Sequence, residues 1–461
     1  MADLPFLSVS ELLTGYARRR FSPVEVARAC LAKIDAHNPV FNAYCLVDAE
    51  AALAQARASE ARWMAGAPQG TLDGIPVSIK DLILTKGWPT LRGSKRVPRD
   101  QAWDEDAPAV ARLRAANAVF LGKTTTPEFG WKGIGDSPLT GITRNPWDRT
   151  KTAGGSSAGA AVAAALGMGS LHLGTDGGGS IRMPAGFCGI FGLKPTFGRV
   201  AAYPPSPAGL LAHQGPMARS VEDAARMMEI IAQPDSRDVY ALPADTGSWL
   251  LDLDKGVAGL KIGFSPTLGG AAVDPEIAAA VANAARLFEK LGASVAEAEP
   301  GLGDLRDAFY KLWTGGIARA LLAHPENLWG ESDPGLVAST RAGMALSAQD
   351  YLAADTLRLR AGETMARFHT RFDLLLTPQL PITAFAAGQD VASPEQSYWI
   401  DWTPFTYPFN MTRQPAASVP LGLHSNGLPM ALQLVGKLGD DRLVMRAARA
   451  FEKAQPWPLP A

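Results

Sequence analysis

An α/β protein is the fold class that this sequence predicts, because segments typical of strands alternate with segments typical of helices. The clearest such run begins with a strand predicted over 260–264. A helix follows, which Asp274 and Pro275 cap and Gly292 ends, and a second strand is predicted over 293–296. A chain of 461 residues is also long enough to bury a large core around such a sheet.

The first part of the chain predicts helices followed by a strand. Ser8–Glu11 and Ser22–Glu25 match the capping box and predict two short helices. An alanine-rich helix is expected over 48–64. Apolar residues then alternate over 75–79 as in a strand, which places Lys80 at or near the strand end.

The middle of the chain continues the alternation. A helix over 107–121 leads into a short strand at 119–122, and the turn-rich residues 124–152 are expected to wrap a site rather than to link domains. A helix of small residues over 157–166 and a strand near 171–175 follow.

The C-terminal half predicts a helical segment and more strands. Ser220 caps a helix that runs to Ile231, and residues 305–370 are mainly helical by pattern and are expected to form a cap. Residues 373–378 form a candidate buried strand. The segments 419–423 and 430–435 are the expected arms of a hairpin.

Composition argues against several classes of function. With 44 basic and 45 acidic residues the net charge is −1, so neither nucleic acid nor a membrane surface is an expected partner. Three cysteines without metal-ligand spacing suit a reducing compartment, and no H-x-x-x-H pair supports a zinc site. The N-terminus lacks a signal-peptide pattern, and the apolar run 158–168 is too short to span a bilayer. We therefore expect a cytoplasmic protein without a metal or an organic cofactor.

Two serine clusters flanked by glycines are the strongest chemical signal. Gly154–Ser157 and Gly177–Ser180 lie on either side of the small-residue helix. The amides of Gly178, Gly179 and Ser180 can point at one oxygen, as an oxyanion hole requires. No histidine stands in a comparable context. Lys80 is the better candidate base, because burial lowers the pKa of a lysine and leaves an amine that can accept a proton through Ser156.

A second serine offers an alternative nucleophile. Gly155–Gly159 matches G-x-S-x-G, the nucleophile elbow of α/β-hydrolases, with Ser157 at its centre. That motif needs a hydrophobic strand directly before it, whereas 145–152 is polar and contains a proline. The elbow is therefore disfavoured. Dinucleotide-binding and P-loop patterns are absent from the sequence.

The combined motifs resemble the amidase signature family. The resemblance rests on Gly74–Asp81, Gly154–Gly159 and Gly174–Pro184, with a spacing of 24 residues between Ser156 and Ser180 (180 − 156). It extends to Thr143–Pro146, Cys188–Gly189, Gly192–Pro195, Pro415–Pro420 and Gly427–Gly436. It implies a single large fold, a twisted mixed β-sheet covered by helices on both faces, with a helical insert.

The resemblance also implies roles for individual residues. Ser180 would be the nucleophile, Ser156 the bridge after a cis peptide bond, and Lys80 the base. The amides of Gly177, Gly178, Gly179 and Ser180 would form the oxyanion hole, and Ser157, Thr175, Asp176 and Arg182 match supporting positions. Four segments are expected: an N-terminal helical segment (1–65), the core with the catalytic motifs (66–232), a βα segment with the helical insert (233–370) and the C-terminal part of the core (371–461).

The expected activity is hydrolysis of a small carboxylic amide through an acyl-serine intermediate, with a homodimer as a possible assembly. Trp131, Trp402 and Tyr407 are candidate walls of a pocket for an apolar or aryl group. The alternatives are a glutaminase-like subunit of an amidotransferase, an esterase and a non-catalytic binding protein. Relatives that take glutamine carry an aspartate at the place of Thr403, with Asp401 and Trp402 beside it here, which disfavours glutamine.

Overall fold

The computed structural model describes residues 3–244 and 247–460. The outermost residues of the predicted segments 1–65 and 371–461, and residues 245–246 of the segment 233–370, therefore lie outside the described part. No helix within that part is both long enough and apolar enough to cross a membrane.

A single mixed sheet of eleven strands organises the molecule, in the order β1-β3-β2-β6-β8-β7-β12-β13-β11-β9-β10. Parallel pairing joins β2 to β3 and to β6, whereas β8 is antiparallel to β6. A separate hairpin pairs β4 with β5. The strands are β1 (Tyr44–Val47), β2 (Pro76–Lys80), β3 (Val119–Thr124), β4 (Asp136–Ser137), β5 (Gly141–Ile142), β6 (Leu171–Asp176), β7 (Phe191–Lys194), β8 (His213–Ala218), β9 (Lys261–Phe264), β10 (Ser294–Glu297), β11 (Leu374–Pro378), β12 (Ala416–Leu423) and β13 (Pro429–Gly436).

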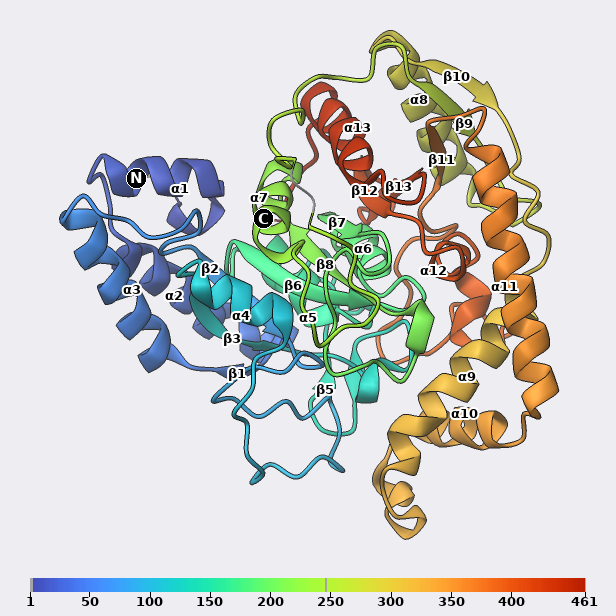
Figure 1. Cartoon of the computed structure of the whole chain (residues 1–461), viewed down its shortest axis with the longest axis horizontal. Helices are drawn as coiled ribbons and strands as arrows, with labels where there is room; N and C mark the ends of the chain where they lie inside the picture. Colours follow the sequence, from blue (N-terminus) through green and yellow to red (C-terminus); the bar gives the residue numbers. More distant parts are fainter. Residues whose placement is uncertain (1–2, 245–246, 461) are drawn as a thin grey trace.

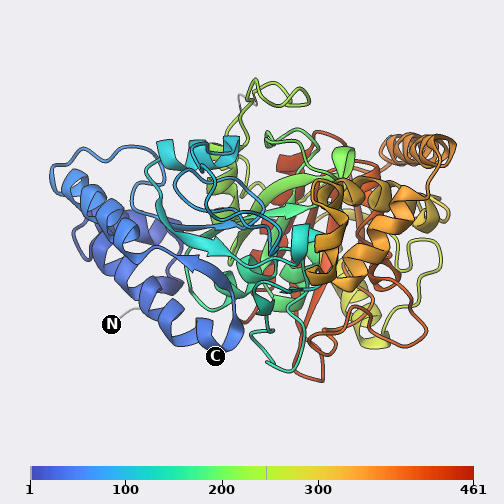
Figure 2. The ribbon, with the colours of Figure 1, turned by 90° about the horizontal axis from the view of Figure 1, so that it is seen from below.

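Helices cover both faces of this sheet (Figures 1 and 2). The α-helices are α1 (Val9–Ala17), α2 (Pro23–Phe41), α3 (Ala49–Met64), α4 (Pro108–Ala115), α5 (Ala158–Ala165), α6 (Arg182–Cys188), α7 (Val221–Ile231), α8 (Pro275–Lys290), α9 (Arg306–Leu322), α10 (Pro334–Met344), α11 (Ala348–Phe368), α12 (Pro408–Met411) and α13 (Asp441–Ala454). Short 3-10 helices are η1 (Leu4–Phe6), η2 (Glu128–Gly130), η3 (Gly209–Leu211), η4 (Glu326–Glu331) and η5 (Trp399–Trp402). The α/β class and the mixed sheet match the expectation from the sequence.

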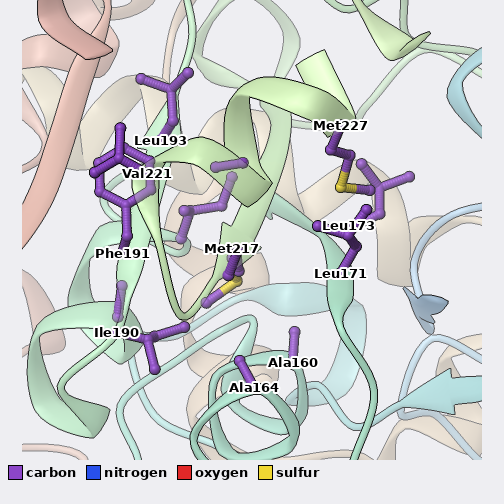
Figure 3. Close-up of a cluster of buried hydrophobic side chains, with 14 of the residues drawn as sticks. Ala160, Ala164, Leu171, Leu173, Ile190, Phe191, Leu193, Met217, Val221 and Met227 are labelled. Carbon is purple, nitrogen blue, oxygen red and sulfur yellow. The ribbon is translucent and has the colours of Figure 1, made fainter. Parts of the chain in front are cut away.

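The main core lies where α5 and α7 enclose the central strands (Figure 3). Leu171 and Leu173 of β6 lie near Met227 of α7, whereas Met217 of β8 points toward Ala160 and the rest of α5. All these side chains are completely buried. Because α5 consists almost entirely of alanine and glycine, it can approach the strands closely, and this brings its N-terminus to the sheet edge where β2 and β6 end.

The predicted helical insert is a group of three packed helices, α9, α10 and α11, at the lower right of Figure 1. Its apolar side chains join a second core with the segment 129–134 and the aromatic segment 398–411. We refer to residues 306–368 as the insert.

One buried cation ties the insert to the rest of the molecule. The ammonium nitrogen of Lys132 lies 2.8 Å from the carboxylate of Asp333, 2.8 Å from that of Asp390 and 3.2 Å from that of Asp136. Burial alone would lower the pKa of Lys132, but the three carboxylates outweigh this effect and raise it. Asp333 also caps the first turn of α10, so the insert is fixed at that point by both contacts.

Predicted and observed elements agree along most of the chain. Both N-terminal capping boxes are formed, at Ser8 and at Ser22. The predicted strands at 260–264 and 373–378 correspond to β9 and β11, with small differences at their ends. The sequence patterns did not predict β1, β4, β5, β7, β8, α6, α12 or α13, although β7 and β8 lie in the middle of the sheet. The helix predicted over 107–121 is shorter in the structure, where α4 ends at Ala115 and β3 begins at Val119.

Candidate active site

Three polar segments meet where the parallel strands β2 and β6 end and α5 begins. Lys80 is the last residue of β2, and Thr175 and Asp176 are the last residues of β6. Ser156 and Ser157 directly precede α5. The carboxyl ends of parallel strands share one edge of the sheet, which is where ligands bind in open α/β sheets.

Lys80 is completely buried and surrounded by hydroxyl groups. Its side-chain nitrogen lies 2.6 Å from Ser156 Oγ, 2.9 Å from Thr175 Oγ1 and 3.0 Å from Ser157 Oγ. It forms no ion pair with any residue of the described chain. Burial lowers the pKa of Lys80 well below its usual value, and the charge of Asp176 offsets only part of this effect. The geometry therefore favours a neutral amine.

The peptide bond between Gly155 and Ser156 is cis, as the family resemblance implies. The backbone N–H of Ser157 donates to the carbonyl of Ser180 at 3.0 Å, which joins the two serine clusters. Ser156 and Ser180 both line one cavity. Within residues 3–244 and 247–460, however, no hydrogen bond links their hydroxyl groups. Catalytic hydrogen bonds are often long in enzymes without bound substrate and shorten when the substrate binds.

The loop 177–180 presents backbone amides beside Ser180. The N–H of Gly179 is occupied, because it donates to Asp176 Oδ1 at 2.8 Å. The N–H groups of Gly177, Gly178 and Ser180 donate to no other described residue, so these three are the amides free to bind an oxyanion. Gly179 has a φ of +128°, and a Cβ atom there would lie 2.5 Å from Thr406 Oγ1. Only glycine fits this position.

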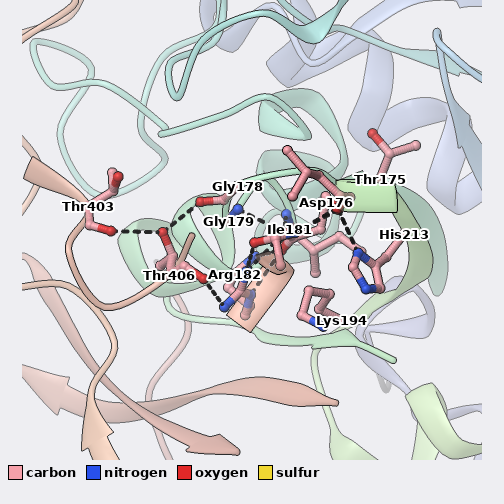
Figure 4. Close-up of polar contacts among 12 residues, drawn as sticks. Thr175, Asp176, Gly178, Gly179, Ile181, Arg182, Lys194, His213, Thr403 and Thr406 are labelled. Atoms are coloured by element: carbon pink, nitrogen blue, oxygen red, sulfur yellow. Dashed lines mark hydrogen bonds and ion pairs between the residues drawn. The ribbon is translucent and has the colours of Figure 1, made fainter. Parts of the chain in front are cut away.

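A buried ion pair holds this loop from below (Figure 4). Two nitrogens of Arg182 each donate to the carboxylate of Asp176 at 3.0 Å. Arg182 also donates to the carbonyl of Thr406, to Gln433 of β13 and to Asn410 of α12, and these contacts hold its side chain in place. Burial would raise the pKa of Asp176, but the Arg182 guanidinium outweighs it and keeps the pKa below its usual range. The carboxylate therefore stays charged and shapes the loop.

The walls of the cavity come largely from segments that carry no motif. The insert contributes Trp313 and Ile317, the segment 202–208 contributes a run of prolines, and Phe129 closes another side. Phe129 lies in the segment 124–152, which the sequence predicts to wrap a site. The sequence singles out neither Trp313 and Ile317 nor the prolines of 202–208, because their local pattern is that of an ordinary core or turn.

The three aromatic residues expected to line the pocket lie elsewhere. Trp131, Trp402 and Tyr407 are buried in the second core and are not among the residues that line the cavity. Trp402 stacks on Phe187 with ring centres 5.8 Å apart, and the backbone carbonyl of Trp131 accepts a hydrogen bond from the indole of Trp313. Trp131 thus holds Trp313 in position, and Trp313 is the aromatic residue that lines the cavity.

His213 is the histidine that lines the cavity, and its surroundings do not suit a base. It is buried, and Nδ1 lies 2.9 Å from the carbonyl of Leu211 and 3.2 Å from that of Asp176. Burial lowers its pKa well below the usual value. Two nearby carbonyls require Nδ1 to carry the proton, which fixes the tautomer. In the described part of the chain, no cluster of three or more His, Cys, Asp or Glu residues could hold a metal ion.

Comparison with known proteins gives consistent matches over nearly the whole chain. A family model described as Amidase matches residues 25–445. An acylamidase of Rhodococcus erythropolis is 37% identical over 99% of this chain and 97% of its own length. One of the subunits of the glutamyl-tRNA(Gln) amidotransferase of Myxococcus xanthus is 36% identical over 98% of each chain. Among solved structures, a bacterial aryl acylamidase of the amidase signature family has a TM-score of 0.92 at 32% identity, covering 98% of this chain and 97% of that one.

Proposed function

Because this chain belongs to the amidase signature family, we propose that Ser180 is the nucleophile of an amide hydrolase, with Ser156 and Lys80 delivering its proton. The chain is an enzyme that hydrolyses carbon–nitrogen bonds of amides. The observation that carries the residue assignment is the contact of 2.6 Å between Lys80 Nζ and Ser156 Oγ, in a site where Lys80 has only hydroxyl partners.

The first half of the reaction forms an acyl-enzyme. The neutral amine of Lys80 takes the hydroxyl proton of Ser156, which in turn takes the proton of Ser180 as the oxygen of Ser180 attacks the amide carbonyl. The carbonyl oxygen becomes an oxyanion, which the free amides of the 177–180 loop bind. The proton now on Lys80 returns through Ser156 to the leaving nitrogen, the carbon–nitrogen bond breaks, and the amine or ammonia departs.

The second half regenerates the enzyme. A water molecule gives up a proton along the same path and attacks the ester carbonyl of the acylated Ser180. The ester bond breaks, Ser180 recovers its proton and the carboxylic acid is released. No step needs a metal ion or an organic cofactor.

We propose that the substrate is an acyl amide with an apolar or aryl portion. The similar proteins are described as an acylamidase and an aryl acylamidase. Trp313, Ile317 and Phe129 give the cavity apolar surface beside the serine, which suits such groups. A panel of aliphatic amides, aryl-acyl amides, anilides and glutamine, compared by kcat/KM, tests this proposal. Glutamine as the best substrate would contradict it.

The second candidate function is that of the glutaminase-like component of a glutamine-dependent amidotransferase, which the 36% identity to one component of such a complex favours. Thr403 stands where glutamine-using relatives are expected to carry an aspartate. Its buried hydroxyl donates to the carbonyl of Ile400. A side chain without charge cannot pair with the ammonium group of glutamine. Ammonia release from glutamine, together with co-purification of partner proteins, would support this second candidate.

Trapping the acyl-enzyme distinguishes Ser180 from Ser157, the nucleophile of the alternative esterase elbow. A serine-directed probe should label the wild-type chain once, and peptide mass spectrometry should place the label on Ser180. Ser157→Ala is the matched control, because it removes a neighbouring hydroxyl of the same site. Labelling that survives Ser180→Ala but disappears in Ser157→Ala would contradict the assignment.

We also propose a cytoplasmic location and a homodimer. The three cysteines are free, which suits a reducing compartment. Light scattering of the purified chain measures its mass in solution, and a monomer across the working concentration range would contradict the dimer.

A further inference from the structure

One charged side chain of the cavity has no role in the proposed mechanism. The charged residues that line the cavity are Asp176 and Arg92, since burial keeps His213 neutral. The charge of Asp176 is compensated by Arg182. Arg92 therefore brings a positive charge to this cavity that is in no ion pair with the residues of 3–244 and 247–460. The charge of Asp81 acts on Arg92 without forming such a pair.

The guanidinium of Arg92 finds no acceptor among the residues that the structure describes. Its Nε atom is buried without a hydrogen-bond partner. Across residues 3–244 and 247–460, its side chain forms no ion pair and no hydrogen bond. The nearby carboxylate of Asp81 lies 3.6 Å from Lys123, with which it is paired. Leaving the buried Nε–H group of a guanidinium unpaired is unfavourable, so an acceptor supplied from outside would be bound favourably.

The backbone holds Arg92 in one place. Its φ is +57°, which is uncommon for a residue with a side chain. Its carbonyl accepts the N–H of Phe129 at 2.7 Å, and Asp81 accepts the N–H of the next residue, Gly93, at 3.5 Å. The guanidinium thus extends from a fixed turn, which favours binding of a ligand at a defined position.

Arg92 lies at the boundary between the catalytic cavity and an outer groove. Phe129, Pro205 and Pro207 line both, as Arg92 does. The groove adds two exposed acidic residues, Asp104 and Glu105, and two basic ones, Arg319 and His324. Burial lowers the pKa of His324, and the charges of Arg96 and Arg92 lower it further. The groove thus carries acidic and basic side chains, and Arg92 lies where the groove meets the catalytic cavity.

We propose that Arg92 binds a carboxylate of the substrate, so that the preferred amides carry an anionic group on the part that extends from Ser180 toward the outer groove. A planar guanidinium binds a carboxylate through two parallel hydrogen bonds. The substrate class is then an amide that is also a carboxylic acid, either a monoamide of a dicarboxylic acid or an amino acid acylated on its nitrogen. This inference rests on the proposed amide hydrolysis and adds a specificity-determining residue to it.

Paired substrates test this proposal. N-phenylsuccinamic acid carries the carboxylate on the acyl side and 4-acetamidobenzoate carries it on the amine side, and their methyl esters are the neutral counterparts. The wild-type enzyme should show a higher kcat/KM for at least one acid than for its ester. Arg92→Met should raise KM for that acid by about 10- to 100-fold, the loss of a charge-assisted hydrogen bond, and leave the neutral counterpart within about threefold. Arg92→Lys should recover part of the loss.

Two controls separate this proposal from the proposed function. Arg319→Met removes a charge that lines only the outer groove, and should change the ratio of acid to ester by less than about threefold if Arg92 carries the preference. In the Ser180→Ala background, calorimetry measures binding of the acid without turnover, so the effect of Arg92→Met is visible even if the hydrolysis proposal fails. The role of Arg92 would be overturned if Arg92→Met lost kcat/KM equally for the acid and its ester. It would also be overturned if both acids bound to Arg92→Met as tightly as to the chain with Arg92.

Discussion

Two lysines lie at or next to the ends of the neighbouring parallel strands β2 and β3, and they differ in the groups that surround their side-chain nitrogens. Lys80 and Lys123 are both completely buried, and burial lowers the pKa of each. Lys123 has a carboxylate partner, Asp81, at 3.6 Å, and donates to the carbonyl of Ile83 at 2.6 Å. The partners of Lys80 are hydroxyl groups alone.

This difference assigns the two lysines to different tasks. A carboxylate beside a buried ammonium group stabilises the charged form, so Lys123 acts as a structural cation that anchors the loop after β2. A hydroxyl can donate to a neutral amine as well as accept from a charged one, so it leaves the amine of Lys80 free to take a proton. The comparison shows that burial alone does not make a lysine a base.

The largest effect is expected from Lys80→Met. Turnover should fall by roughly 10⁴-fold or more, because the variant lacks the proposed base for Ser180. Unfolding stability at neutral pH should stay equal or rise, since methionine fills the space without a buried amine. Steady-state kinetics and urea unfolding measure the two quantities. Turnover near that of the wild type would remove Lys80 from the mechanism.

Lys123→Met should show the reverse of Lys80→Met, with a large loss of unfolding stability and a smaller effect on turnover. The variant leaves the carboxylate of Asp81 buried without its partner, which typically costs about 3–5 kcal/mol of unfolding free energy. The double variant Lys123→Met with Asp81→Asn should be less destabilised than the single one, because it removes both charges. If Lys123→Met were as stable as the wild type, the ion pair would have no structural role.

The pH dependence of stability sharpens the comparison. Below pH 10.5 the unfolded chain protonates residue 80, whereas the folded chain keeps it neutral down to its lowered pKa. The unfolded state thus binds more protons in this window, and the wild type loses stability relative to Lys80→Met as the pH falls, by about 1.4 kcal/mol per pH unit. Urea titrations of both chains measure this slope. If the difference in unfolding free energy between the wild type and Lys80→Met did not change with pH below 10.5, Lys80 would be charged in the folded chain. Activity should be lost on the acidic side, where Lys80 becomes protonated.

The smallest effect is expected from Thr175→Val, which removes one hydroxyl partner of Lys80 at 2.9 Å. Turnover should fall by about 3- to 10-fold, because the amine loses one of the contacts that orient it. Thr124→Val is the matched control. Thr124 lies on β3, which pairs with the strand of Lys80. Its hydroxyl is buried and has no hydrogen-bond partner among the described residues, so its removal should leave turnover unchanged. Equal losses in the two variants would assign the effect to packing.

The sequence predicted the centre of the site because its signals are local. The alternation over 75–79 places Lys80 at a strand end, and the glycines before Ser180 mark a loop of exposed amides. Of the strands that the sequence patterns did not predict, β8 has contrary local signals. β8 contains both Gly215 and Pro216, residues that argue against a central strand, and packing between α5 and α7 overrides that preference.

The cavity wall could not be read from the sequence, because it depends on how distant segments approach each other. Trp131 and Trp313 are both aromatic residues in apolar surroundings, yet only Trp313 faces the cavity. Trp313 faces the cavity because α9 packs against the loop 177–180. The two are so close that a Cβ atom on Gly177 would lie 2.8 Å from the Trp313 ring. Arg92 is likewise an ordinary surface arginine by its sequence context, and only the fold brings it to the cavity.

The cluster around Lys132 limits how inserts can be exchanged between relatives. Its three carboxylates come from the start of β4, from the start of α10 and from the segment after β11. A chimera that receives a foreign insert loses Asp333 but keeps the other two acids, so the graft retains its electrostatic anchor only if the donor helix begins with an acidic cap. An exchange of inserts that aims to transfer substrate preference must therefore first retain a carboxylate at the position of Asp333, and only then the residues that line the pocket.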